Sequence, residues 1–193
     1  MNYLFKICLV GDSGTGKTTF IESLVKNFYY ESKEKTVGID FFTYVSDDVK
    51  FQVWDTSGNI MFIGIVRSYF NDASGILLFF SDKKSFNNID YWIEEIRKIN
   101  KKCKLILIQS ASDFDLEYIG QDDIHLKCDK YVIDKFIKIN RKCMKNIESV
   151  LPEMANLLVH KKAVSFNNTT DYIKLEGEEE EGGKSFCDKC SVL

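Results

Sequence analysis

The sequence predicts one α/β domain with a mostly parallel β-sheet, and three observations support this. Apolar residues alternate along the chain between strand-like runs and helical stripes with a spacing of three to four. Two runs, Ile76–Phe80 and Leu105–Ile108, are apolar throughout, as is typical of parallel strands covered on both faces. A chain of 193 residues that is 45% hydrophobic is also long enough to bury a complete core. Disulfide or metal staples are therefore not needed.

In the first half of the chain, the pattern predicts one strand, one helix and a hairpin. Leu4–Val10 is a short apolar strand, and a helix opens at Thr18. The apolar stripe of this helix consists of Phe20, Ile21, Leu24, Val25 and Phe28. Ile39–Val45 and Val49–Trp54 follow as strands around the polar residues 46–48, a spacing that predicts an antiparallel pair.

In the second half, the pattern predicts three more strands and two helices. The strands are Ile76–Phe80, Leu105–Ile108 and the weaker Phe136–Ile139. The helix between the first two has a stripe of Phe86, Ile89, Trp92, Ile93, Ile96 and Ile99. The last helix has an apolar face of Ile147, Val150, Leu151, Met154, Leu157 and Leu158. Because proline fits only the first turn of a helix without kinking it, Pro152 implies that this helix either starts near Ser149 or is bent.

We expect the domain to cover residues 1–162 and a disordered tail to cover residues 163–193. Beyond residue 162 the apolar period stops, and five glutamates lie between positions 176 and 181. The formal net charge of −3 argues against nucleic acid as a partner. Apolar runs stay far below the roughly 20 residues of a membrane span, the start leaves no room for a signal peptide, and the six cysteines are scattered. These features favour a cytoplasmic protein.

A glycine-rich motif lies between the first strand and the first helix. It fits G-x-x-x-x-G-K-S/T in full and reads Gly11-Asp12-Ser13-Gly14-Thr15-Gly16-Lys17-Thr18. Gly14 and Gly16 let the backbone turn its N–H groups toward phosphate oxygens, and the helix N-terminus adds a positive dipole end. Lys17 supplies a charge for the β- and γ-phosphates, and the Thr18 hydroxyl can ligate Mg²⁺. The motif predicts a nucleotide-binding P-loop rather than a glycine-rich turn without a ligand.

A second group of residues lies at the end of the third strand. Asp55 stands where a Mg²⁺-holding aspartate is expected, although without the P-loop a simple strand-ending aspartate would be the better interpretation. The N–H group of Gly58, three residues later, could meet a γ-phosphate.

Together these residues resemble a small GTPase of the Ras superfamily, in its Rab branch. Val37–Phe41 resembles the Rab effector loop, Trp54–Gly58 the opening of switch II, and Arg67–Phe70 the element after it. The resemblance covers roughly residues 4–160 and implies a P-loop NTPase small G domain, with a mostly parallel six-stranded sheet, one antiparallel strand and about five flanking helices. It also implies a GTP/GDP- and Mg²⁺-binding switch in vesicle trafficking, with effector, exchange and GTPase-activating proteins as partners.

The resemblance also assigns roles to individual residues. Thr36, nineteen positions after Lys17, matches the switch I threonine that binds Mg²⁺ and the γ-phosphate only in the triphosphate state. Tyr29 matches an aromatic that packs against guanine, but it is equally one more member of an aromatic cluster. The implied Mg²⁺ ligands are Thr18, Thr36 and Asp55. The implied nucleotide-binding residues are Asp12, Ser13, Gly14, Thr15, Gly16, Lys17, Thr18, Thr19, Tyr29, Thr36, Gly58, Asp113, Arg141 and Lys142.

Two motifs depart from the family pattern. Asn59 stands in place of the catalytic, water-positioning glutamine and is one methylene shorter, which predicts slow hydrolysis. The base motif Asn-Lys-x-Asp reads Ser110-Ala111-Ser112-Asp113. Asp113 can still bind guanine through two hydrogen bonds, the alternative being a solvated loop aspartate. The third base segment, Ser-Ala-Lys in the family, reads Asn140-Arg141-Lys142, and the backbone N–H of Arg141 can serve guanine O6. We expect weaker guanine binding, by about 1–3 kcal/mol.

The sequence Cys190-Ser191-Val192-Leu193 fits a C-a-a-X prenylation box. Cys187 is a candidate second lipid site, because one lipid chain gives only reversible attachment and the tail is acidic rather than basic. The alternative, half of a zinc site, lacks a second pair of ligands. We therefore expect a prenyl transferase and a solubilising chaperone as partners, and peripheral attachment to the cytosolic face of an endomembrane or the plasma membrane.

Two functions remain open from the residues alone. The first is a slow Rab-like GTPase, which the P-loop, Thr36, Asp55 and Gly58 favour. The second is a pseudo-GTPase or adaptor that binds nucleotide weakly or constitutively, which the altered base motifs favour. A small-metabolite kinase is disfavoured because the sequence shows no arginine-rich lid.

Overall fold

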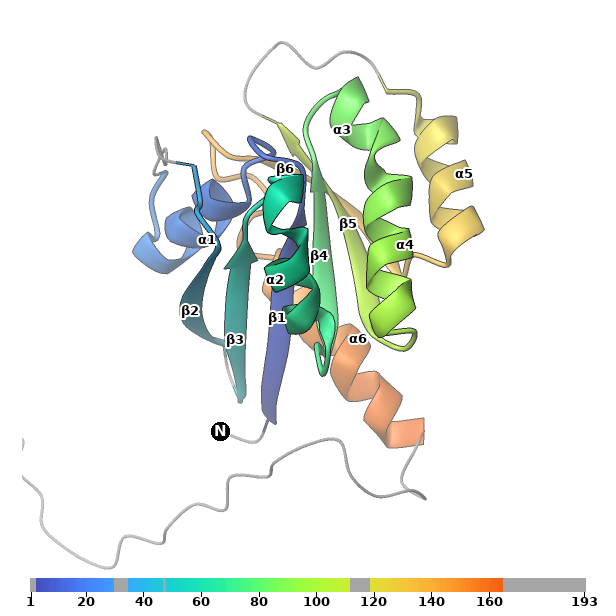
Figure 1. The fold of residues 1–193 in the computed structure, drawn as a ribbon. Coiled ribbons are helices and arrows are strands. Elements are labelled where there is room, and N and C mark those ends of the chain that lie inside the picture. The colour runs from blue at the N-terminus through green and yellow to red at the C-terminus, as the bar shows by residue number, and fades with distance from the viewer. Residues whose placement is uncertain (1–2, 30–34, 47, 112–118, 165–193) are drawn as a thin grey trace, which may run out of the picture.

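The computed structural model describes residues 3–29, 35–46, 48–111 and 119–164. Its centre is a six-stranded sheet with the strand order β2-β3-β1-β4-β5-β6 (Figure 1). All neighbouring strands are parallel except β2 and β3, which pair antiparallel as predicted. The strands are β1 Tyr3–Gly11, β2 Ile39–Ser46, β3 Val49–Thr56, β4 Gly75–Phe80, β5 Lys104–Ala111 and β6 Lys135–Asn140.

Helices cover both faces of the sheet. They are α1 Lys17–Lys26, the 3₁₀ turn η1 Ile60–Phe62, α2 Ile63–Phe70, α3 Lys83–Asn87, α4 Ile89–Ile99, α5 Gln121–Tyr131 and α6 Val150–Val164. Alternate residues of β1 point into two separate cores, because strand side chains alternate between faces. Ile7 and Leu9 pack with α1 and α6, whereas Cys8 and Val10 pack with α2, α3, α4 and α5. This confirms the predicted α/β fold of a small G domain.

Most predicted elements are present, with a few corrections. The single helix expected across Phe86 and Ile99 is divided at Asn88 into α3 and α4. Helices α2 and α5 were not predicted individually, and α5 has only one buried residue, Ile124, so its sequence has little apolar period. Val25 and Phe28 are expected in the apolar stripe of α1 but are 48% and 57% exposed. Phe28 lies beyond the end of the helix at Lys26, and Val25 lies in the last turn, where no residue after Leu24 is buried.

The last helix resolves the question that its proline raised. Helix α6 starts at Val150, so Pro152 lies in its first turn, and a start near Ser149 was the correct alternative. The helix continues to Val164, just past the expected domain boundary, and residues 165–193 lie outside the described part of the chain. Among the described residues, no helix combines the length and apolar content that a bilayer crossing requires.

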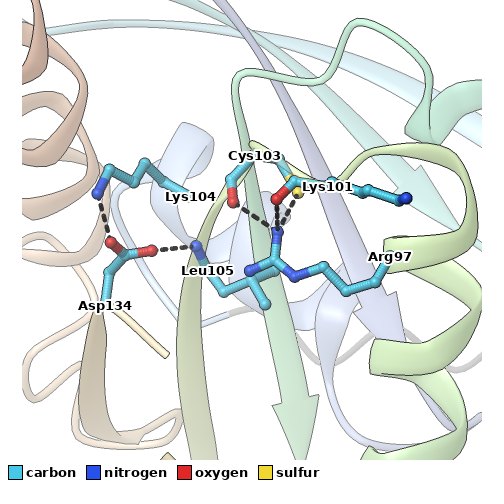
Figure 2. A network of polar contacts seen from close by, with 6 residues as sticks. All are labelled: Arg97, Lys101, Cys103, Lys104, Leu105 and Asp134. Carbon is cyan, nitrogen blue, oxygen red and sulfur yellow. Dashed lines mark hydrogen bonds and ion pairs between the residues drawn. The ribbon is translucent and has the colours of Figure 1, made fainter. Parts of the chain in front are cut away.

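Polar contacts fix the start of β5 (Figure 2). Arg97, near the end of α4, donates from Nη1 to the carbonyl oxygens of Lys101 and Cys103, at 3.1 and 3.0 Å. On the other side of the strand, Asp134 accepts from Lys104 Nζ at 2.5 Å and from the backbone N–H of Leu105 at 2.8 Å. The amino end of β5 is therefore held on both sides.

Candidate nucleotide-binding site

The P-loop connects the carboxyl end of β1 to the start of α1, where ligands bind in parallel α/β sheets. Gly11, Gly14 and Gly16 have φ angles of +134°, +85° and +86°, a region that residues with a Cβ rarely adopt. Gly16 is also the N-cap of α1, so the first free N–H groups of the helix face the loop. The glycine spacing thus builds the phosphate cradle that the motif predicts.

Lys17 is the charged group of this cradle. Its side chain is 5% exposed, and Nζ donates to the carbonyl oxygens of Gly11 and Asp12, both at 2.8 Å. Burial lowers the pKa of Lys17 to about 8, and the nearby carboxylates of Asp55 and Asp12 oppose this shift. A bound polyphosphate would favour the charged ammonium, so the cradle and its lysine suit an anionic ligand.

The three predicted Mg²⁺ ligands come together beside the P-loop. The hydroxyl of Thr18 lies 2.8 Å from that of Thr36 and donates to Asp55 Oδ2 at 2.5 Å. Thr36 also donates to Asp55 Oδ2, at 3.4 Å. The other carboxylate oxygen of Asp55, Oδ1, is buried and has no hydrogen-bond partner within the described part of the chain. Two hydroxyls and a carboxylate are the hard oxygen ligands that Mg²⁺ prefers, so these residues fit that ion.

The electrostatics of Asp55 support the same interpretation. The residue is fully buried, and this burial raises its pKa to about 6, although the hydrogen bond from Thr18 and the charge of Lys17 oppose the shift. A divalent cation would favour the ionised carboxylate and satisfy its free oxygen. The cluster therefore has the oxygen ligands of a cation site, and a bound cation would satisfy the buried Oδ1 of Asp55.

Gly58 lies directly against the P-loop. A Cβ atom placed on it would be 2.2 Å from the backbone nitrogen of Ser13 and 2.5 Å from the carbonyl oxygen of Gly11. Only glycine therefore fits at this contact. The preceding residue, Ser57, donates its N–H to the carbonyl oxygen of Gly38 at 2.9 Å. The segment after β3 is thus joined to both the phosphate loop and the segment before β2.

The sequence does not predict that Asn88 and Trp92 belong to the site. Both donate to the carboxylate of Asp12 in the P-loop, Asn88 from Nδ2 and Trp92 from Nε1, each at 2.7 Å. Trp92 was assigned only to the apolar stripe of its helix, and an indole N–H in a buried stripe was the one feature that signalled a polar partner. These bonds hold the Asp12 carboxylate on the α3–α4 side of the loop.

The remaining P-loop predictions lie where the motif puts them. Thr15 is buried and its hydroxyl donates to the carbonyl oxygen of Asp12 at 2.8 Å, which tightens the loop. Thr19 is buried in the first turn of α1, and Ser13 is exposed on the loop. Tyr29 follows α1 and is half-buried.

The side chain of Asn59 makes its hydrogen bond within its own segment of the chain. It is exposed, and its Oδ1 accepts from the backbone N–H of Met61 at 3.0 Å, which caps η1. Its own N–H donates to the hydroxyl of Ser57 at 3.3 Å. The amide that was expected to position a water molecule is therefore engaged at the start of a helical turn.

The base-recognition side of the site is built differently from the phosphate side. Ser110, in place of the family's asparagine, is fully buried, and its hydroxyl finds no hydrogen-bond partner among the residues that the structure describes. The Asn140 side chain accepts from the backbone N–H groups of Lys142 and Cys143, at 3.0 and 3.2 Å, and so shapes the loop after β6.

Lys142 is exposed, and Asp113 lies outside the described residues. Arg141 reaches the P-loop through its side chain, against Gly16.

Comparison with known proteins agrees with this geometry. The family described as "Roc: Ras of Complex, Roc, domain of DAPkinase" matches residues 6–113. The human "Ras-related protein Rab-19" is 32% identical over 171 residues, which cover 84% of this chain and 79% of the relative. "GTP-binding protein ypt1" of Schizosaccharomyces pombe is 30% identical over 175 residues, which cover 87% of this chain and 85% of the relative. "Ras-related protein RIC1" of Oryza sativa is 31% identical over 173 residues, with 84% of each chain covered. The chain belongs to the Ras superfamily of small GTPases and is a Rab-like member of it.

Proposed function

We propose that this protein is a guanine-nucleotide switch that binds GTP and GDP with Mg²⁺ and hydrolyses GTP slowly. The observation that carries the proposal is the meeting of Thr18, Thr36 and Asp55 beside a complete P-loop. One buried carboxylate oxygen in that cluster has no hydrogen-bond partner among the described residues and would accept a cation, and an anion beside the buried Lys17 would favour its charged form. A nucleotide polyphosphate with Mg²⁺ meets both needs.

Different residues of the site would bind the phosphates, bind Mg²⁺ and respond to the γ-phosphate. The P-loop N–H groups and Lys17 would hold the phosphates, and Thr18, Thr36 and Asp55 would hold Mg²⁺, which neutralises charge between the β- and γ-phosphates. Thr36 lies before β2 and Gly58 lies after β3, so a γ-phosphate that bound both would join the two segments. Loss of that phosphate would release Thr36 and Gly58 together, which is how order in such segments reports hydrolysis.

Slow hydrolysis follows from Asn59. A shorter amide that already caps η1 is poorly placed to orient an attacking water molecule. Because phosphoryl transfer depends almost entirely on positioning, a displacement of this kind can slow the reaction by about 10²-fold. A partner could supply the missing group in trans.

We also propose effector, exchange and activating proteins as partners, in vesicle trafficking. The support for this is an aromatic row, Phe41–Trp54–Tyr69, with ring centroids 4.7 and 4.8 Å apart, next to the switch segments. In the segment before β2 and in η1 after β3, Val37, Ile60 and Met61 are 77%, 59% and 85% exposed. Exposed apolar side chains on segments that bind partners are typical of a protein-binding surface.

Membrane attachment through Cys190 is part of the same proposal, with Cys187 as a second lipid site. The support is the C-a-a-X motif alone. Incubation of the protein with a prenyl transferase and labelled prenyl diphosphate tests it. Label should enter the wild type and not Cys190→Ser, and equal labelling of both would contradict it.

The nucleotide content of the purified protein tests the switch itself. Denaturation followed by chromatography should release GDP or GTP in a ratio approaching one per chain. A folded protein that contains no nucleotide and binds none when it is added would instead support the adaptor. The buried hydroxyl of Ser110, which has no hydrogen-bond partner among the described residues, favours that second function, because the asparagine that Ser110 replaces would brace the base loop.

A further inference from the structure

The side chain of Arg141 lies against the N-terminus of α1. A Cβ atom placed on Gly16 would be 2.5 Å from Arg141 Nη1, 2.8 Å from Cδ and 2.9 Å from Cζ. The space that a side chain would fill at position 16 is therefore occupied by the guanidinium of Arg141. This contact joins the loop after β6 to the P-loop, although the two segments are far apart in sequence.

The place of this contact matters because Gly16 is part of the phosphate cradle. It is the N-cap of α1, and the next residue is the buried Lys17. Free N–H groups at a helix N-terminus and a lysine beside them attract phosphate oxygens. A guanidinium keeps its charge at every physiological pH and presents a planar fork of donors that matches phosphate geometry. Arg141 therefore brings to the rim of the cradle a second donor group, which, unlike Lys17, stays charged at every physiological pH.

We propose that the Arg141 side chain is a nucleotide-binding group that contacts the diphosphate. The proposal rests on the proposed function, since it names a further residue of the same site. The sequence assigned Arg141 only a backbone contact to the base. In this chain the lysine of the base motif is replaced by Ala111, which pairs with Asn140, the residue before Arg141. The loop after β6 thus supplies a cation next to the position where the cation of the β5 loop is lost.

Arg141→Gln is the direct test, because glutamine keeps a polar side chain and removes the charge and the donor fork. Arg141→Lys keeps the charge without the fork. Lys138→Gln is the matched control, since Lys138 is exposed on β6 and its loss changes the net charge by the same amount. The full chain is titrated with fluorescent GDP and, by competition, with inorganic pyrophosphate, and thermal unfolding shows that each variant is folded.

We expect Arg141→Gln to weaken GDP and pyrophosphate binding alike, by about tenfold or more, as for the loss of a charge-assisted hydrogen bond. The affinity of Arg141→Lys for both probes should lie between those of the wild type and Arg141→Gln. The affinity of Lys138→Gln should equal that of the wild type. If Arg141→Gln binds GDP as tightly as the wild type does, the inference is overturned. Tighter binding by Arg141→Gln would overturn it too, because the arginine side chain of the wild type would then obstruct the cradle. A loss for GDP but not for pyrophosphate would overturn the assignment to the diphosphate. If the wild type itself binds neither probe, the proposed function fails and the inference fails with it.

Discussion

The phosphate side and the base side of the nucleotide site differ in how closely they keep the family pattern. On the phosphate side, the P-loop glycines, Lys17 and the Thr18–Thr36–Asp55 cluster are in contact distance of one another. On the base side, a buried serine replaces the asparagine and makes no side-chain hydrogen bond to any described residue, and an alanine replaces the lysine. Affinity that comes from phosphates and Mg²⁺ should therefore persist, while selectivity for guanine should be reduced.

The difference also shows how one site can change in parts. The phosphate groups depend on backbone geometry, such as the positive φ angles of Gly14 and Gly16, and few residues can replace those that provide it. The base groups depend on side chains at loop ends, where substitution leaves the fold intact. Four measurements separate the two sides, from the largest expected effect to the smallest.

Gly58→Ala should have the largest effect. The new Cβ atom would lie 2.2 Å from the backbone nitrogen of Ser13, so the P-loop or the segment after β3 must move. A displacement of about 1 Å in such a site can cost about 10²-fold, and we expect at least that loss in affinity for a slowly hydrolysed GTP analogue. Titration with the fluorescent analogue measures it.

Gly64→Ala is the matched control for this change. Gly64 lies in α2, and a Cβ atom placed on it meets no atom of the described residues within 4 Å. Its affinity should equal that of the wild type. An unchanged affinity in Gly58→Ala would contradict the close packing of this segment on the phosphate loop.

Asn59→Gln should accelerate hydrolysis by about tenfold, within the range that positioning provides. The longer side chain can reach past the cap of η1, where Asn59 now accepts from Met61. Single-turnover hydrolysis of GTP, followed by phosphate release, measures the rate. Asn71→Gln, an exposed change of the same kind beyond α2, is the control. If both variants hydrolyse GTP at the wild-type rate, the role assigned to Asn59 is wrong.

The preference for GDP over ADP should be only about tenfold, because a single bidentate contact to a base provides roughly 1–3 kcal/mol of discrimination. Competition between the two nucleotides measures it. The double variant Ser110→Asn with Ala111→Lys restores the family's base motif and should increase the preference. A wild-type preference above about a thousandfold would show that other groups recognise the base, since one such contact does not provide it.

Trp92→Phe should have the smallest effect. It keeps the aromatic packing of α4 but removes one of the two hydrogen bonds to Asp12, while Asn88 retains the other. We expect GDP affinity to fall about threefold, at the low end of the net contribution of a single hydrogen bond, because Asn88 still holds the Asp12 carboxylate. Tyr91→Phe, a neighbouring change, is the control. A loss as large as that of Gly58→Ala would mean that Asp12 organises the whole loop.

Much of the fold follows from the sequence, because buried parallel strands such as Ile76–Phe80 are apolar throughout. The P-loop and Asp55 were found because their motifs are local. Helix α5 was missed because it buries only Ile124, so it lacks a clear apolar period. The contacts of Asp12 with Trp92 and of Gly16 with Arg141 were missed for another reason. They join segments that only the tertiary fold brings together, and neither pair belongs to one motif.

The central claim is that the cradle around Lys17 binds a nucleotide polyphosphate with Mg²⁺. Titration of the wild type and Lys17→Ala with fluorescent GDP and GTP, in the presence of Mg²⁺, tests it most directly. The wild type should saturate, and Lys17→Ala should bind at least about 100-fold more weakly, because the variant loses the buried ammonium that would pair with the phosphates. Superimposable curves for the two proteins would contradict the account.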